Sequence, residues 1–131
     1  MPVILRLPCR PERTGATPEF IEVMRDDLWV DLDDIRSASG SNTEIGFQWC
    51  ERVAEPDTDL ILWCDEDGKL KGLEPNPYSL ALCNRDQLAG AVIVTRYKVN
   101  GNGDPYGLTE GQIKRLAALY NIDPETNRTL A

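Results

Sequence analysis

Hydrophobic and polar positions along the chain predict several strands. From Glu44 to Arg52 apolar and polar side chains alternate, which is typical of a half-buried strand. Leu60 to Cys64 is apolar at every position, so it is expected to be buried on both faces near the centre of a sheet. Gly90 to Tyr97 is rich in β-branched residues and predicts a further strand, as does the shorter apolar stretch from Val3 to Leu7.

The segment after the central strand contains turn residues and prolines. Asp65 to Gly68 is predicted to be a hairpin turn, in which Gly68 takes the positive φ that closes it. Lys69 to Leu73 is expected to return as the partner strand. Pro75 and Pro77 cannot donate backbone hydrogen bonds, so an irregular crossing is expected around them.

Two helices are predicted in the first third of the chain. Thr17 can cap a helix that begins at Pro18, because proline suits the first helical position. At helical spacing, one face of this helix would carry Phe20, Ile21, Met24 and Leu28. A charged residue would interrupt that face if the helix continued. A second helix is therefore expected to begin after Asp31 as its cap, with Leu32 and Ile35 facing inward.

The strongest helix signal lies near the C-terminus. Thr109 and Gln112 have the spacing of a capping box, and Leu108 and Ile113 have that of a hydrophobic staple. The predicted inward face consists of Ile113, Leu116, Ala117 and Tyr120. This helix is expected to end near Asn121, and residues 122–131 are predicted to be a frayed tail.

These elements predict an α+β fold with an antiparallel or mixed sheet of four to five strands covered by two or three helices. The helices that begin at Thr17 and Thr109 are expected to cover the same face. The chain has 131 residues, which is close to the commonest size of one domain, and no linker interrupts it. A single domain over residues 1–131 is therefore expected.

Composition excludes several classes of protein. A formal net charge of −8 disfavours binding to nucleic acids and to anionic membranes. No stretch approaches the length of a membrane span, and the first ten residues do not resemble a signal peptide, so the cytoplasm is expected. The four cysteines include no C-x-x-C pair, so neither a zinc site nor a native disulfide is expected.

Catalytic chemistry has little support in the sequence. The chain contains no histidine, which removes the commonest acid–base group and the Ser–His and Cys–His mechanisms. Phosphate-binding glycine motifs and the nucleophile-elbow motif are also absent from the sequence. We therefore expect a non-enzymatic protein that needs no cofactor. Trp29, Trp49 and Trp63 are expected in the core rather than in an aromatic cage.

Acidic residues are concentrated between residues 19 and 34, where seven acids face one base, Arg25. The candidate partner-binding residues are Glu19, Glu22, Asp26, Asp27, Asp33 and Asp34. On the predicted helix, Glu19, Glu22 and Asp26 would form an exposed stripe. Such a stripe could bind a basic protein surface, in part by imitating the charge of DNA, or it could serve only to solvate the protein.

A second candidate surface is the passage from Lys69 to Tyr78. Its candidate ligand-binding residues are Lys69, Lys71, Asn76 and Tyr78. Two cations, an amide and an aromatic ring around a kinked backbone could hold a phosphate or a base. Alternatively, the lysines protect an edge strand and Asn76 satisfies backbone groups between the two prolines.

The chain also resembles a known family from Leu60 to Tyr120. The features that carry the resemblance are the D-E-D-G turn, the passage G-K-L-K-G-L-E-P-N-P, the strand led by Gly90 and the closing helix L-T-E-G-Q-I-K-R-L. They are similar to a family of phage- and plasmid-borne accessory proteins known only as a domain of unknown function, family 3846. The resemblance implies an α+β fold and a mobile-element origin, and it implies no activity.

These observations together favour a phage-type accessory protein that acts by binding. Its expected target is a host protein, reached through the acidic segment in a host-takeover or anti-defence role. Sequestering of a small nucleotide-like ligand by the second surface is the alternative, and an enzyme of unknown type is the third possibility. The protein is expected to be a monomer or a small homo-oligomer.

Overall fold

Seven strands form one sheet in the computed structural model, which describes residues 1–9, 17–40, 46–47, 59–68, 70–83, 88–97 and 104–130, and the backbone of residues 50–55. The strands are β1 (Val3–Leu7), β2 (Glu19–Glu22), β3 (Cys50–Glu55), β4 (Leu60–Asp65), β5 (Val92–Tyr97), β6 (Pro105–Tyr106) and β7 (Arg128–Leu130). The helices are α2 (Leu32–Ser39) and α3 (Glu110–Tyr120), with a short 3₁₀ turn, η2 (Ser79–Ala81).

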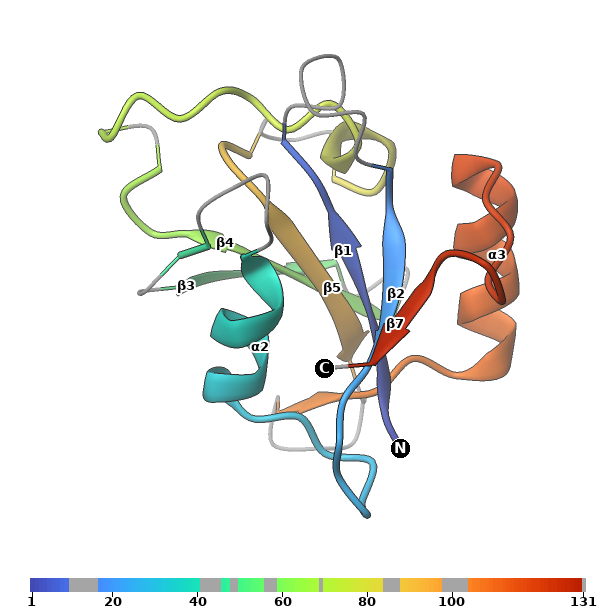
Figure 1. The fold of residues 1–131 in the computed structure, drawn as a ribbon. Helices are drawn as coiled ribbons and strands as arrows, with labels where there is room; N and C mark the ends of the chain where they lie inside the picture. The colour runs from blue at the N-terminus through green and yellow to red at the C-terminus, as the bar shows by residue number, and fades with distance from the viewer. Residues whose placement is uncertain are drawn as a thin grey trace.

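The sheet is mixed, and its strands follow the order β3-β4-β5-β1-β2-β7, with β6 paired to β5 (Figure 1). Every pairing is antiparallel except that of β2 with β7. This arrangement confirms the predicted α+β fold with a mixed sheet, and the sheet has more strands than the four to five expected.

Buried side chains form two clusters, one on each face of the sheet. In β1, Leu5 and Leu7 belong to the cluster that packs against α3, while Ile4 belongs to the one that packs against α2. The same alternation runs through β4 and β5. The two helices therefore lie on opposite faces of the sheet (Figure 1). The expectation that helices beginning at Thr17 and Thr109 cover the same face is wrong. One face is covered by α3 and the other by α2, which begins after Asp31, because strands that bury apolar side chains on both sides need cover on both sides.

The helix predicted from Thr17 is also wrong. Residues 19–22 form β2, which pairs Phe20 with Leu5 and Ile21 with Ile4. Two consecutive apolar residues can share a helix face, but in a strand they point to opposite faces, and here each fills a different cluster. Tertiary pairing with β1 decides between these two patterns.

The region around the predicted hairpin differs from the expectation. β4 already has β3 and β5 as neighbours, so it has no edge for a third partner, and residues 70–72 form turns instead of a strand. The Asp65 carboxylate, 8% exposed, holds the turn by accepting the Asp67 N–H at 2.8 Å. The positive φ angles of the described glycines are at Gly72 and Gly90, not at Gly68. The irregular crossing around Pro75 and Pro77 is confirmed.

The strand predicted over residues 44–52 begins later than expected. β3 starts at Cys50, and Phe47 lies outside any strand, buried in the cluster on the α2 face. Residues 44, 45, 48 and 49 lie outside the described residues. Strand β4, by contrast, begins at the predicted Leu60, and every one of its side chains is buried.

Both the start and the end of the C-terminal helix are predicted correctly. Thr109 and Gln112 form the capping box, and Asn121 ends α3 in the left-handed conformation. The prediction that residues 122–131 form a frayed tail is wrong for residues 128–130. These residues form β7, which pairs in parallel with β2. Arg128 also donates a hydrogen bond to Glu22 at 3.1 Å. The tail therefore completes the edge of the sheet.

Truncation of the chain after Asn127 tests this correction. It removes the backbone pairing of β7 and the ion pair between Arg128 and Glu22, so we expect the free energy of unfolding to fall by about 2 kcal/mol. Urea denaturation measures this loss, with a variant lacking only Ala131 as the control. An unchanged urea midpoint after truncation would show that β7 contributes nothing to stability.

Candidate protein-binding surface

Residues 24–34, here called the acidic loop, comprise the connection from β2 to α2 and the first three residues of α2, and the connection projects beyond the end of the sheet (Figure 1). Backbone hydrogen bonds tie this loop to the segment that contains β6. Gly107 donates its N–H to the Leu28 carbonyl at 2.9 Å, and Val30 donates its own to the Pro105 carbonyl at 3.1 Å. Val30 is fully buried. The acidic loop therefore has a defined course even though it lies at the surface.

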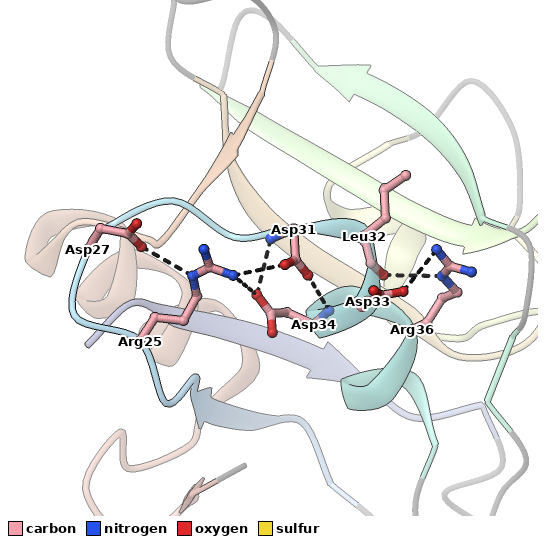
Figure 2. A network of polar contacts seen from close by, with 7 residues as sticks. All are labelled: Arg25, Asp27, Asp31, Leu32, Asp33, Asp34 and Arg36. Atoms are coloured by element: carbon pink, nitrogen blue, oxygen red, sulfur yellow. Dashed lines mark hydrogen bonds and ion pairs between the residues drawn. The ribbon is translucent and has the colours of Figure 1, made fainter.

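One arginine organises the carboxylates of the loop (Figure 2). Arg25 donates hydrogen bonds to Asp27 at 3.1 Å, to Asp31 at 2.9 Å and to Asp34 at 3.0 Å. Its guanidinium also lies over the Trp29 ring, 4.9 Å from the ring centre. These contacts join the middle of the loop to the start of α2.

Two of these aspartates also begin the helix. Asp31 accepts the Asp34 N–H at 2.8 Å, and Asp34 accepts the Asp31 N–H at 3.1 Å, which together form a capping box. The predicted capping role of Asp31 is confirmed, and so is the inward position of Ile35. The hydrogen bond from the Asp34 N–H, helped by Arg25, holds the pKa of Asp31 below its usual value.

The predicted stripe of Glu19, Glu22 and Asp26 does not form, because β2 replaces the helix that would have aligned them. Glu19 and Glu22 fall on opposite faces of the strand. Glu19 accepts two hydrogen bonds from the buried Arg6, at 2.6 and 3.0 Å, and Glu22 pairs with Arg128. Both glutamates thus stabilise the sheet and are only partly exposed.

Three carboxylates of the acidic loop do face solvent. Asp26 is exposed, the Asp27 side chain is 62% exposed, and the Asp33 side chain is 88% exposed although it pairs with Arg36 at 3.1 Å. Asp34, by contrast, is held by Arg25 and by the capping box, with its side chain only 23% exposed. The candidate acidic surface therefore narrows to Asp26, Asp27 and Asp33.

Exposed apolar side chains occupy the same loop. They are Met24 (61% exposed), Leu28 (60%), Trp29 (37%) and Leu32 (47%). Each of them was predicted to face the core, and these predictions are wrong because the loop turns away from the sheet. Trp63, in contrast, is buried as expected and donates a hydrogen bond to Thr95 at 3.0 Å, while Trp49 lies outside the described residues. The sequence contained one signal that the helix could not continue: Asp31, a charged residue that would interrupt its apolar face.

Among the described residues, the candidates for the alternative ligand-binding site do not converge on a common site. Asn76 is fully buried, so it cannot contact a ligand. Its amide donates to the carbonyls of Leu7 and Gly90 at 2.9 Å, and its carbonyl oxygen accepts the N–H groups of Tyr78 and Ser79. The alternative prediction, that Asn76 satisfies backbone groups between two prolines, is confirmed.

Two other candidates in the passage from Lys69 to Tyr78 also make contacts within the protein. Lys71 donates to Asp65 at 3.0 Å, and the Tyr78 ring packs edge to face against Tyr120, with ring centres 5.6 Å apart. The Tyr120 hydroxyl donates to the Tyr78 carbonyl at 2.8 Å, and burial raises the pKa of Tyr120 well above its usual value. Lys69 lies outside the described residues.

Other chemical groups offer no further site in the described part of the chain. The thiols of Cys9, Cys64 and Cys83 lie buried and form no disulfide. No cluster of three or more potential metal ligands occurs among the residues whose positions are described. Within the same residues, neither helix has the length and apolar character to cross a membrane.

The fold and this surface define an α+β protein with a mixed sheet and an ordered acidic loop that exposes apolar side chains. The chain belongs to the family described as Domain of unknown function (DUF3846), which matches residues 13–121. The match thus includes the acidic loop, beyond the C-terminal half that carried the resemblance in the sequence. No curated protein and no solved structure matches the chain significantly.

Replacement of Asn76 by Ala tests its structural role. Four backbone groups lose the hydrogen bonds that the fully buried Asn76 side chain makes to them, so we expect the free energy of unfolding to fall by about 3 kcal/mol or more. Asn127→Ala is the matched control, since its amide donates to Thr17 and accepts from Thr126 at exposed positions, and it should cost less than about 1 kcal/mol. Equal losses in the two variants, measured by urea denaturation, would contradict this role.

The lowered pKa of Asp31 predicts a pH dependence of stability. Because its folded pKa lies below the unfolded value of about 3.9, the stabilisation is complete above that value and disappears as the pH falls through the folded pKa. Asp31→Asn keeps a capping oxygen but cannot ionise. The difference in the free energy of unfolding between wild type and Asp31→Asn should therefore be constant at neutral pH and shrink below about pH 4.

Asp31→Ala serves as the control for the cap itself. It removes the capping oxygen at any pH, so relative to Asp31→Asn it is expected to cost about 1 kcal/mol under both neutral and acidic conditions. A difference between wild type and Asp31→Asn that stays the same from neutral pH to about pH 2.5 would show that the ionised carboxylate adds nothing to the cap.

Proposed function

We propose that this protein is a non-enzymatic, phage-type accessory protein that binds a host protein through its acidic loop. The observation that carries the proposal is the fixed position of Asp26, Asp27 and Asp33 at the surface. Arg25 and the capping box hold the backbone from which these carboxylates project. The proposed setting is the cytoplasm of the host, in a host-takeover or anti-defence role.

Electrostatics favour a basic protein as the partner. The chain carries a net charge of −8, and three exposed carboxylates on one loop would attract a cationic surface and speed its association. The same charge opposes binding to nucleic acids and anionic membranes. Because the loop is already ordered, little conformational entropy needs to be lost on binding.

The double variant Asp26→Asn/Asp33→Asn tests this proposal against the partner captured from a lysate of the host. It removes two exposed carboxylates and keeps all three aspartates that contact Arg25. We expect the association rate constant, measured by surface plasmon resonance at low salt, to fall several-fold and its dependence on salt to weaken. Circular dichroism and thermal unfolding should be nearly unchanged.

A control for net charge is available on the opposite side of the sheet. Glu110→Gln/Glu125→Gln removes the same number of charges at exposed positions in and after α3. Its association rate should stay close to that of the wild type. If both double variants slow binding equally, net charge rather than the acidic loop determines association, and unchanged kinetics in the first variant would refute the proposal.

A further inference from the structure

The acidic loop exposes more apolar surface than solubility requires. Nine large apolar side chains are exposed in the part of the chain that the structure describes, and four of them belong to this loop. Single exposed apolar residues are ordinary at protein surfaces, but a concentration of them marks an interaction site. The four side chains are those of Met24, Leu28, Trp29 and Leu32.

Three of these residues, Leu28, Trp29 and Leu32, belong to backbone that the contacts of the acidic loop hold in position. Trp29 lies beneath the Arg25 guanidinium, and the carbonyl of Leu28 is bound by the Gly107 N–H. Leu32 occupies the first turn of α2, and its side chain points away from Arg25 (Figure 2). An ordered Trp next to an Arg is typical of the residues that dominate binding energy at protein interfaces.

The charges around these side chains decide what can cover them. A second copy of the chain would bring its own Asp26, Asp27 and Asp33 against the same residues, so like charges would oppose self-association through the loop. A partner that is only positively charged, such as one that recognises DNA by its phosphates, would leave the four apolar side chains in water. A partner with apolar side chains bordered by Lys or Arg would satisfy both features.

We propose that the acidic loop docks a cationic amphipathic segment of a protein, with Met24, Leu28, Trp29 and Leu32 as apolar anchors and the exposed aspartates as the charged rim. This inference rests on the proposed function and adds the chemistry of the partner. The anchors slow dissociation because their apolar surface leaves water on binding, whereas the aspartates speed association. The interaction is therefore recognition of an apolar face within a basic surface, and not imitation of DNA.

A synthetic 18-residue amphipathic helix of Leu and Lys is the probe. Two other peptides accompany it: one with the same composition but scrambled so that it has no apolar face, and one with Glu in place of Lys. Binding is followed by Trp fluorescence of the full chain, with Trp29→Phe to identify the signal of the loop. We expect the amphipathic Leu/Lys peptide to bind at least tenfold more tightly than either of the others.

Variants of the apolar anchors distinguish the docking proposal from the proposed charge-based function. Leu28→Ser and Met24→Ser should each weaken binding of the Leu/Lys peptide about tenfold, mainly through faster dissociation and with an unchanged salt dependence. Leu28→Met should restore binding, and Leu119→Ser on α3, where the side chain is 49% exposed, should leave it unchanged. All these positions are exposed, and thermal unfolding of each variant checks that the fold is retained.

Three other results would each contradict one or both of the proposals. If the scrambled Leu/Lys peptide binds as tightly as the amphipathic one, or the Ser variants bind normally, the anchors play no role, while the charge-based function stands. If the Glu peptide binds as tightly as the Leu/Lys peptide, both proposals fail. If sedimentation velocity shows a dimer that Met24→Ser dissociates, a second copy covers the apolar side chains, and the docking proposal is wrong.

Discussion

The central strands β1, β4 and β5 bury apolar side chains on both faces, and the rest of the structure depends on this constraint. Each face must be covered by another layer. The helix α3 covers one face, while α2 and Phe47 cover the other. The chain therefore has to cross from one side of the sheet to the other, and the acidic loop is the connection that brings α2 into place.

The contacts of Arg25 connect this requirement to the candidate surface. By holding Asp31 and Asp34, the arginine helps to fix the start of α2, whose Ile35 and Ala38 complete the buried cluster. By holding Asp27 and lying over Trp29, it fixes the outer part of the loop. Arg25 thus contributes both to the cover of the sheet and to the shape of the candidate binding surface. Changes at Arg25 would therefore affect stability and, under the proposed function, binding.

The number of acidic residues in a stretch of sequence does not show how many of them are exposed at the surface. Of the six acids first considered for partner binding, Glu19 and Glu22 are paired with arginines on opposite faces of β2, and Asp34 is part of a helix cap. The loop that remains combines carboxylates with apolar side chains. Such a surface gains association rate from charge and residence time from apolar burial.

The sequence by itself determined the elements whose signals are local. Apolar runs predict strands β4 and β5. Side chains that bond to the backbone three residues away predict the helix caps at Asp31 and Thr109. Together these elements give the α+β class. Tertiary structure decided what depends on distant pairing. Phe20 and Ile21 fit a helix face or a strand equally well, and only β1 and β7 beside them select the strand. That selection placed Met24, Leu28 and Trp29 on an exposed loop instead of a helix, because Val23 directly follows β2 and the next buried residue after it is Val30.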